Sequence, residues 1–400
     1  AVSDANDIAF CGGTTSANLN FLNNWEPNYQ GGSADGFLGR IQGDGSSITA
    51  GTYVGSSAYD QSYFVELDGD NQVHIYGQTQ APGSTFIFNA DYGTPSSGMH
   101  VAKFSDDLNT LIWSTVFGTG SGEPNLSPTA FLVDVCGKIY LSGWGGSTNT
   151  SSNPNTDNVF NMDITPDAFQ STTNGSDFYI LVIEDDASAL VYASYFGGLT
   201  SNEHVDGGTS RFDRKGQIYQ SVCAGCGSND DFPIFPANAH SPTNNSNNCN
   251  NGVFKFDFEL PITIADFNLP PTICANEAIP FINNSVNVSQ VSWDFGDNTQ
   301  SSTFSPQHQY LEPGVYEVTL AVSNPLTCNM SDTLRRTIEI VEANVSTQAL
   351  EQLCAGDSLT IGLMDENPEF TYTWTPSTGL SSPNSANSFL IAENDQLYTL

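Results

Sequence analysis

Four residues between positions 223 and 249 could act together chemically. Cys223 and Cys226 are two residues apart, and His240 and Cys249 follow them. Thiolates and imidazoles are the usual zinc ligands, and cysteines at this spacing can also form a redox dithiol. A redox dithiol belongs at a strand-to-helix junction, and no helical pattern follows Cys226. Three interpretations stay open: a disulfide between Cys226 and Cys249 (with Cys223 as the alternative partner), free thiols or another pairing, and a metal site.

His204 lies between Glu203 and Val205-Asp206, and an imidazole beside carboxylates could transfer protons in acid–base catalysis. No activated nucleophile accompanies it, because the chain has no Gly-x-Ser-x-Gly elbow. Phosphate-binding loops and dinucleotide fingerprints are also missing from the sequence. We therefore expect that the protein is not an enzyme and requires no cofactor.

Asp68-Gly69-Asp70-Asn71 places carboxylate oxygens at alternate positions, which suits calcium. The same residue types are also preferred in β-turns. The remaining ligands of a calcium loop are missing, so a turn is the favoured interpretation. The same reasoning applies to Asp294 and Asp297. Calcium at Asp68, Asp70, Asp294 and Asp297 is thus a weak hypothesis, and it is the only cofactor that the sequence suggests.

The charge balance excludes several classes of partner. The chain has 400 residues, with 9 Lys+Arg against 44 Asp+Glu and a net charge of −35. A protein that binds nucleic acids or anionic membrane surfaces needs clustered Lys and Arg residues, and this chain has few of either. No apolar run is long enough to span a bilayer, so we expect no membrane insertion. The acidic surface suits solubility in salty surroundings, and eight cysteines are compatible with an oxidising, extracellular location.

Short strands must position these groups. Gly, Ser, Thr, Asn and Asp crowd the gaps between short apolar runs, and no long stretch has apolar residues at helical spacing. The pattern predicts an all-β protein. Its length exceeds what one core usually accommodates, which predicts more than one domain.

A repeated layout fills residues 1–258. Gly55, Gly118 and Gly197 each end a strand, lie 63 and 79 residues apart, and are followed by an Asp/Gly turn and another strand. A unit of about four strands cannot bury both faces of its sheet alone, so the copies must stack. The residues resemble the bacterial β-propeller repeat W-S-T-Y-x-G-G, then D-x-x-G-N-x-Y-x-x-G, with Asp231-Phe232-Pro233 as its last element. The resemblance implies a β-propeller-like domain, and an array of β-sandwiches is the alternative.

The pattern changes over residues 262–343. Trp293-Asp294-Phe295-Gly296-Asp297-Asn298 precedes Pro306-Gln307-His308-Gln309-Tyr310 and an alternating apolar run at 314–322. These motifs resemble those of the polycystic-kidney-disease (PKD) domain, an immunoglobulin-like (Ig-like) sandwich. Asn298 replaces a glycine of the family pattern, and Asn tolerates the positive φ of a turn. In related domains, cysteines at the spacing of Cys274 and Cys328 are bridged, so the resemblance implies that disulfide here.

Residues 344–400 begin a third module. Leu353-Cys354-Ala355-Gly356-Asp357 and Tyr372-Thr373-Trp374 resemble Ig-like repeats found beside PKD domains in large exported proteins of the Bacteroidetes. The segment predicts a second Ig-like sandwich, which is incomplete in this chain. Export by the type IX secretion route is implied by the resemblance alone.

Together these features predict a secreted cell-surface adhesin or a structural subunit of an extracellular appendage. The propeller loops would make contact, and the PKD and Ig-like modules would act as spacers. The expected partners are other copies of the chain, other surface proteins and cell-surface glycans. The alternative is a catalytic or non-catalytic part of a secreted carbohydrate-active enzyme or protease, for which no pair of acids is singled out.

Overall fold

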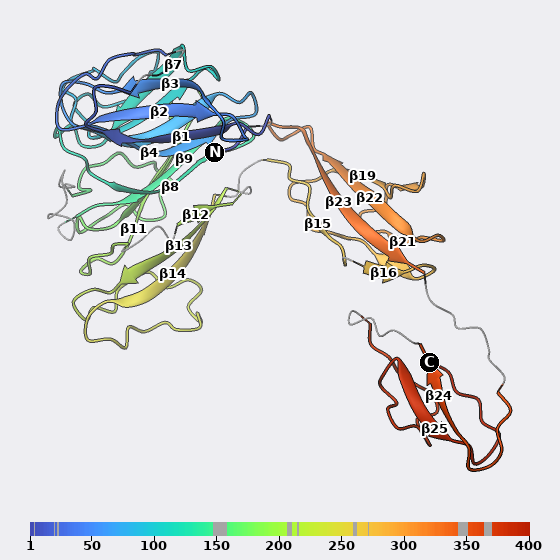
Figure 1. Ribbon diagram of the computed structural model, residues 1–400. Helices are drawn as coiled ribbons and strands as arrows, with labels where there is room; N and C mark the ends of the chain where they lie inside the picture. The colour runs from blue at the N-terminus through green and yellow to red at the C-terminus, as the bar shows by residue number, and fades with distance from the viewer. Residues whose placement is uncertain are drawn as a thin grey trace. The chain divides into compact units, whose positions relative to one another are not determined.

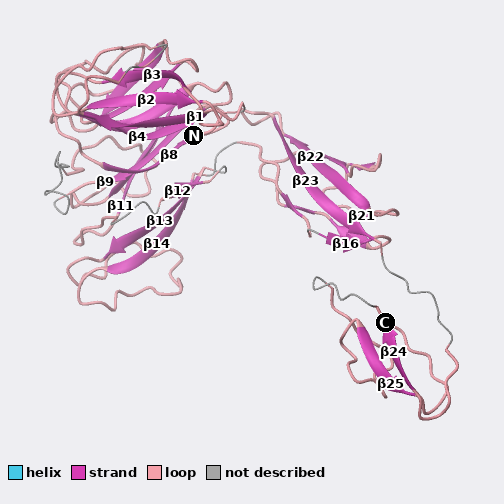
Figure 2. Ribbon diagram, viewed as in Figure 1, coloured by secondary structure: helices cyan, strands magenta, loops and turns pink. Residues whose placement is uncertain are grey.

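The computed structural model describes residues 1–400 apart from 4, 20, 22–23, 147–157, 206–209, 214–215, 259–261, 271, 343–350 and 364–369. The chain divides into two compact units, 1–340 and 341–400. The described residues form strands, turns and loops without a helix, which confirms the all-β prediction (Figure 2). The predicted domain limits of 1–258, 262–343 and 344–400 remain predictions.

Four antiparallel sheets follow one another along the first 257 residues (Figure 1). The first sheet contains β1 (Ile8–Thr14), β2 (Asp35–Ile41) and β3 (Ile48–Val54). The second contains β4 (Asp60–Leu67), β5 (Val73–Thr79), β6 (Met99–Phe104) and β7 (Leu111–Phe117). The third contains β8 (Ser127–Val133), β9 (Ile139–Trp144), β10 (Phe178–Ile183) and β11 (Leu190–Phe196). The fourth contains β12 (Arg211–Phe212), β13 (Gln217–Ala224) and β14 (Asn250–Asp257).

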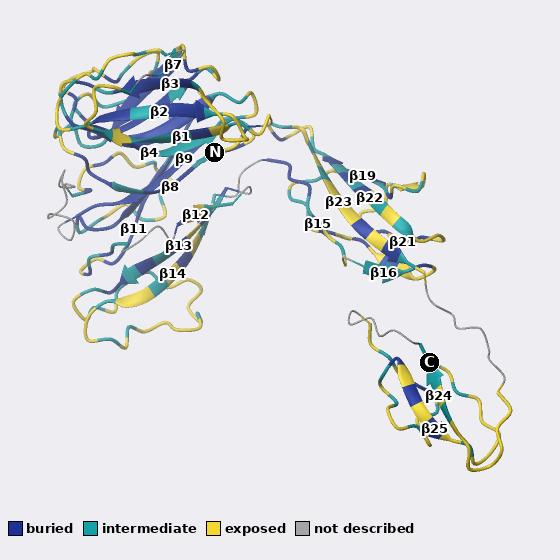
Figure 3. Ribbon diagram, viewed as in Figure 1, coloured by how far each residue is buried: buried dark blue, intermediate teal, exposed yellow. Residues whose placement is uncertain are grey.

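Successive sheets share hydrophobic clusters, so each middle sheet is covered on both faces. In β5, Ile75 joins the cluster shared with the first sheet, and Tyr76 joins the cluster shared with the third. A further cluster, containing Phe178 and Phe254, joins the third and fourth sheets. Because alternate residues of a strand point to opposite faces, this arrangement buries every residue of β5, β9 and β10. Figure 3 shows the buried colour along β9. In the fourth sheet, Val253 is 71% exposed.

One aspartate turn recurs in three of these sheets and explains part of the repeat pattern. In the first instance Asp68 Oδ1 accepts a hydrogen bond from Gln72 N at 2.9 Å, and Oδ2 lies 3.1 Å from His74 Nε2. Asn71 has a φ of 58°, a conformation that Asn and Gly adopt readily. The equivalent turns use Asp134 with Gly137, Lys138 and Tyr140, and Asp213 with Gly216, Gln217 and Tyr219.

The predicted propeller is neither established nor contradicted by this layout. The predicted unit of about four strands matches the second and third sheets, and the stacking between units is present. A closed ring is not seen among the described sheets, so the β-propeller remains a prediction.

The segment from residue 262 to 341 forms a small sandwich of short strands. Its largest sheet has the order β16 (Thr272–Cys274), β23 (Ser331–Val341), β22 (Gly314–Ser323), β19 (Gln290–Asp294) and β20 (Gln300–Ser301). Two smaller pairs are β15 (Phe267–Asn268) with β18 (Ile282–Asn283), and β17 (Ala278–Pro280) with β21 (Gln307–Gln309).

The expected motif residues make the core and turns of this sandwich. Trp293 is fully buried, and the ring of Phe281 packs edge-on against it with centroids 5.6 Å apart. Tyr310 donates a hydrogen bond from its hydroxyl to Phe295 O at 2.8 Å. Val318 is buried on the inner face of β22, which confirms the predicted alternation. Asn298 has a φ of 70°, which confirms the prediction of a positive φ.

The unit 341–400 contains one described two-stranded sheet, β24 (Ser358–Gly362) with β25 (Asn387–Ile391). Trp374 is buried there and donates a hydrogen bond from Nε1 to Ser385 O at 3.0 Å. The predicted second Ig-like sandwich remains a prediction.

Candidate functional site

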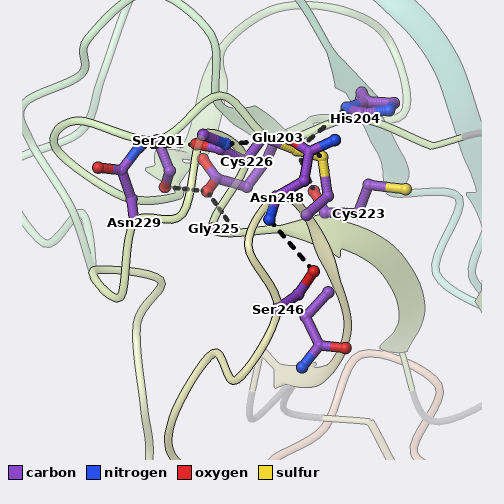
Figure 4. The surroundings of a disulfide bond; sticks show 12 residues. Ser201, Glu203, His204, Cys223, Gly225, Cys226, Asn229, Ser246 and Asn248 are labelled. Atoms are coloured by element: carbon purple, nitrogen blue, oxygen red, sulfur yellow. Dashed lines mark hydrogen bonds between the residues drawn. A yellow bond between two sulfur atoms is a disulfide. The ribbon is translucent and has the colours of Figure 1, made fainter.

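A disulfide closes the long loop between β13 and β14. Cys226 follows β13, Cys249 precedes β14, and the structure joins them as a disulfide, the pairing favoured from the sequence (Figure 4). The strand register explains their proximity, because Ala224 pairs with Asn250 at the end of the hairpin. The cross-link reduces the number of conformations open to the unfolded loop. We call residues 226–249 the disulfide loop.

Side-chain amides hold the interior of the disulfide loop in place. Asn244 Nδ2 donates hydrogen bonds at 3.0 Å to the carbonyl oxygens of Gly225, Asn229 and Asn248. The backbone N of Asn244 also donates to Asp230 Oδ1 at 2.6 Å. Two large apolar side chains of this loop are exposed, Ile234 at 40% and Phe235 at 87%, and Phe235 projects furthest into solvent. An aromatic ring on a constrained polar loop is a suitable contact group for a protein or a sugar ring.

His204 is the histidine that lies near the disulfide. Its Nδ1 is 3.8 Å from Cys226 Sγ, and the ligand atoms of His204, Cys226 and Cys249 all lie within 4.8 Å of one another. These atoms could hold a metal only after reduction, because thiolates are the ligands. His240, the ligand considered from the sequence, is exposed on the loop and outside this group. Figure 4 shows the Cys223 side chain directed away from the disulfide.

The backbone of His204 has a structural role. It forms an isolated bridge with Cys223, whose N donates to His204 O at 2.9 Å. The imidazole lies 5.8 Å from the Trp144 ring between centroids, with the two rings tilted. These contacts fix His204 between the third and fourth sheets.

Buried carboxylates lie beside the disulfide loop. Glu203 is fully buried, and its Oε2 accepts a hydrogen bond from Gly198 N at 3.1 Å. Asp231, within the loop, accepts from Thr200 N at 2.6 Å. Burial, together with the neighbouring Glu203 carboxylate, raises the pKa of Asp177 to about 7. Burial likewise raises the pKa of Glu203.

Sequence reasoning missed Asp177 and Asp231 as members of a site, and it considered Glu203 only as a neighbour of His204. One signal could have revealed part of the group. Each repeat glycine is followed five to seven residues later by a carboxylate or amide side chain, namely Asp60, Asn125 and Glu203.

The weak calcium candidates all serve as turn residues. Asp68 lies 2.9 Å from the Lys103 ammonium, measured from Oδ2 to Nζ, and this positive charge opposes a calcium ion. In the sandwich, Asp294 Oδ1 accepts from Gly296 N at 2.9 Å, and Asp297 Oδ1 accepts from Thr299 N at 3.0 Å. Asp70 is exposed beside Asp68. Calcium at these four residues remains an untested hypothesis.

The disulfide implied between Cys274 and Cys328 is not formed in the structure. The loop after Cys274 hydrogen-bonds to Tyr310 near the start of β22, whereas Cys328 follows the end of that strand. Ten residues of strand, about 30 Å at ~3.3 Å per residue, separate the two ends. Cys328 is joined instead to Cys136, with Cα atoms 6.0 Å apart.

The remaining cysteines lie apart from these pairs. Cys11 packs half-buried against the cluster between the first and second sheets, and burial raises its thiol pKa to about 12. Cys354 is exposed.

Two surface hollows stand out in the described residues, and neither contains an acidic or histidine side chain. One, of about 400 Å³, is lined by Val288, Ser289, Gln290, Val291, Ser302 and Phe304. The other, of about 220 Å³, is lined mainly by Trp25, Phe86, Phe88, Phe104 and Leu111. A glycosidase needs two carboxylates facing each other across the bound sugar, and these hollows do not supply them.

Comparison with protein families matches residues 263–338 to the PKD domain, so this part of the chain is a PKD domain. Comparison with curated proteins gave no match. Among the described residues, none forms a helix long and apolar enough to cross a bilayer.

Three solved PKD domains illustrate the likeness. The PKD1 domain of Vibrio anguillarum Epp is 25% identical over 20% of this chain and 94% of its own, with a TM-score of 0.18. The PKD1 domain of the Vibrio cholerae metalloprotease PrtV is 26% identical over 20% and 93%, with a TM-score of 0.16. The PKD domain of human SorCS2 is 14% identical over 21% and 76%, with a TM-score of 0.18.

Proposed function

We propose that this chain belongs to an extracellular binding protein, a cell-surface adhesin or a subunit of a surface appendage, that makes contact through the disulfide loop. The observation that carries the proposal is the exposed Phe235 on a loop held by a disulfide and by Asn244. A constrained loop loses little conformational entropy on binding, and an aromatic side chain supplies much contact energy in little area.

The rest of the chain supports this role. The PKD domain has a continuous hydrophobic core of its own, which suits a compact spacer. The net charge of −35 disfavours nucleic acid and anionic lipid, and favours uncharged or cationic partners. The proposed partners are glycans, other surface proteins or further copies of the chain, and the protein carries out no reaction.

Binding of the fluorescently labelled whole chain to bacterial cells and to a polysaccharide array tests the proposal. The Phe235→Ala variant should bind at least tenfold more weakly, because the exposed ring is removed while the loop stays cross-linked. Phe389→Ala is the matched control, since Phe389 is a 45% exposed phenylalanine of β25 that lines neither hollow. Equal binding by the wild type and Phe235→Ala, or turnover of a glycan or peptide by the wild type, would refute it.

A further inference from the structure

Three carboxylates from separate segments converge where the third sheet meets the fourth. Asp177 immediately precedes β10, Glu203 lies between β11 and β12, and Asp231 belongs to the disulfide loop. All three surround the backbone of Gly197 and Gly198. An ideal Cβ placed on Gly197 would lie 2.8 Å from Glu203 Oε2 and still closer to Asp177 Oδ1. One on Gly198 would lie 2.5 Å from Asp231 Oδ1.

The glycines therefore leave room for the carboxylate oxygens, which occupy the place that a side chain would take. Asp177 is fully buried, and neither of its carboxylate oxygens has a hydrogen-bond partner. Asp231 Oδ1 is also buried without a partner. None of the three acids forms an ion pair with a described Lys, Arg or His. Burying an uncompensated carboxylate is costly, so the group requires either protons or a cation.

At the equivalent place between the second and third sheets, uncharged side chains find hydrogen-bond partners within the protein. There Asn125 takes the position of Glu203, and Ser97 that of Asp177, around Gly118. Asn125 Nδ2 donates to Asn158 O at 2.8 Å, and its Oδ1 accepts from Thr119 N at 3.0 Å. At this junction the protein supplies internal partners to both ends of the Asn125 amide, and no described carboxylate is buried beside it.

Between the first and second sheets the same place holds Asp35 against Gly55, with the carboxylate of Asp60 nearby. Asp60 accepts hydrogen bonds from Ser56 N at 2.6 Å and from Thr79 Oγ1 at 2.5 Å, and Asp35 Oδ1 is the one described buried carboxylate oxygen there without a partner. The junction with Asp177 has a third carboxylate and more oxygens without partners. It is consequently the strongest cation candidate of the three.

We propose that Asp177, Glu203 and Asp231 form a Ca²⁺ site at this junction. Asp177 and Glu203 bind the ion directly, and Asp231, half-exposed on the loop, binds it through a water molecule. Calcium fits because it takes six to eight oxygen ligands in flexible geometry and accepts backbone carbonyls and water beside carboxylates. Since Asp231 belongs to the disulfide loop, the ion also ties that loop to the third sheet. The proposal does not depend on the proposed binding function.

Terbium luminescence on the whole chain tests the site, because Tb³⁺ replaces Ca²⁺ and is sensitised by nearby indoles. Trp144 pairs with Phe178, the residue after Asp177, and is the expected sensitiser. We expect saturable emission that Ca²⁺ abolishes, and a melting temperature that Ca²⁺ raises and EDTA lowers. Asp177→Asn should lower the affinity for Ca²⁺ at least tenfold. Asp186→Asn, which removes one exposed charge, should leave affinity unchanged.

Two results would overturn the proposal. The first is that the wild-type protein shows no saturable Tb³⁺ emission that Ca²⁺ displaces. In that case its melting temperature would rise when the pH is lowered from 8 to 6, and by the same amount in Ca²⁺ as in EDTA. That pattern means the acids share protons instead. The second is unchanged Ca²⁺ affinity in Asp177→Asn. If this variant does not fold, Asp231→Asn on the exposed loop replaces it, with an expected loss of about threefold or more, and its failure to weaken binding is equally decisive.

Discussion

Replacing Asp68 by Asn should destabilise the second sheet substantially. The Asp68 side chain is 8% exposed, the Lys103 side chain is 12% exposed, and the two charges lie 2.9 Å apart. Removing one partner of a buried ion pair costs about 3–5 kcal/mol, because the other charge is left without compensation. Asn retains an oxygen that can accept from Gln72 N. We therefore expect a cost at the lower end of that range, about 3 kcal/mol.

Amide hydrogen exchange of the β5 peptide in increasing urea measures the free energy of unfolding of the second sheet alone. A local measurement is needed because the chain contains several units. Lys103→Met should recover about half of the loss in the double variant, since the stranded ammonium is then gone. Asp107→Asn is the matched control, because Asp107 caps an exposed turn through Asn109 N and forms no ion pair with another described residue. A cost below about 1 kcal/mol for Asp68→Asn would refute the ion-pair reasoning.

The pH dependence provides an independent check. Burial raises the pKa of Asp68, but hydrogen bonds from His74, Lys103 and Gln72 lower it by more, so it lies below its ordinary value. A depressed carboxyl pKa stabilises the fold above the unfolded pKa of ~3.9 and loses that effect as the pH falls through the folded value. The difference between wild type and Asp68→Asn should be constant from pH 8 to 5 and shrink below about pH 4. A difference that stays constant down to pH 2.5 would contradict this.

Three further predictions concern other parts of the chain. Trp293→Ala should destabilise the PKD domain by about 3–5 kcal/mol in urea denaturation followed by circular dichroism, because the fully buried indole leaves a cavity. Asn298→Gly should change that stability by less than about 0.5 kcal/mol, whereas Asn298→Val should cost about 1–2 kcal/mol, because a branched residue resists a φ of 70°. A joint Cys226→Ser and Cys249→Ser change should cost the fourth sheet about 2–4 kcal/mol by hydrogen exchange, and peptide mapping of the wild type should find these cysteines linked.

The PKD domain could be predicted because its determinants are local. Trp293, Phe295 and Asn298 lie within six consecutive positions, and the alternation of β22 specifies which of its residues are buried. The repeat was likewise visible because each copy places a turn aspartate such as Asp68 at a similar distance from its glycine. Both signals survive in one sequence because they depend on near neighbours along the chain.

The buried acid group and the pairing of Cys328 could not be predicted in the same way. Asp177, Glu203 and Asp231 come from three segments with 25 or more intervening residues between each pair, and only the packing of two sheets unites them. Spacing along the chain cannot show that Cys274 and Cys328 lie at opposite ends of one strand. Such facts depend on how sheets and strands are placed in space.

The sharing of hydrophobic clusters between successive sheets has a consequence for how this region can evolve. The strands β5, β9 and β10 contact neighbouring sheets on both sides. A duplicated unit would therefore pack against apolar sheet faces similar to those that the original unit contacts. Gain or loss of a unit would alter two contacts and leave the other interfaces intact. The number of units can therefore drift by recombination between repeats, while insertions accumulate in the polar connections between strands.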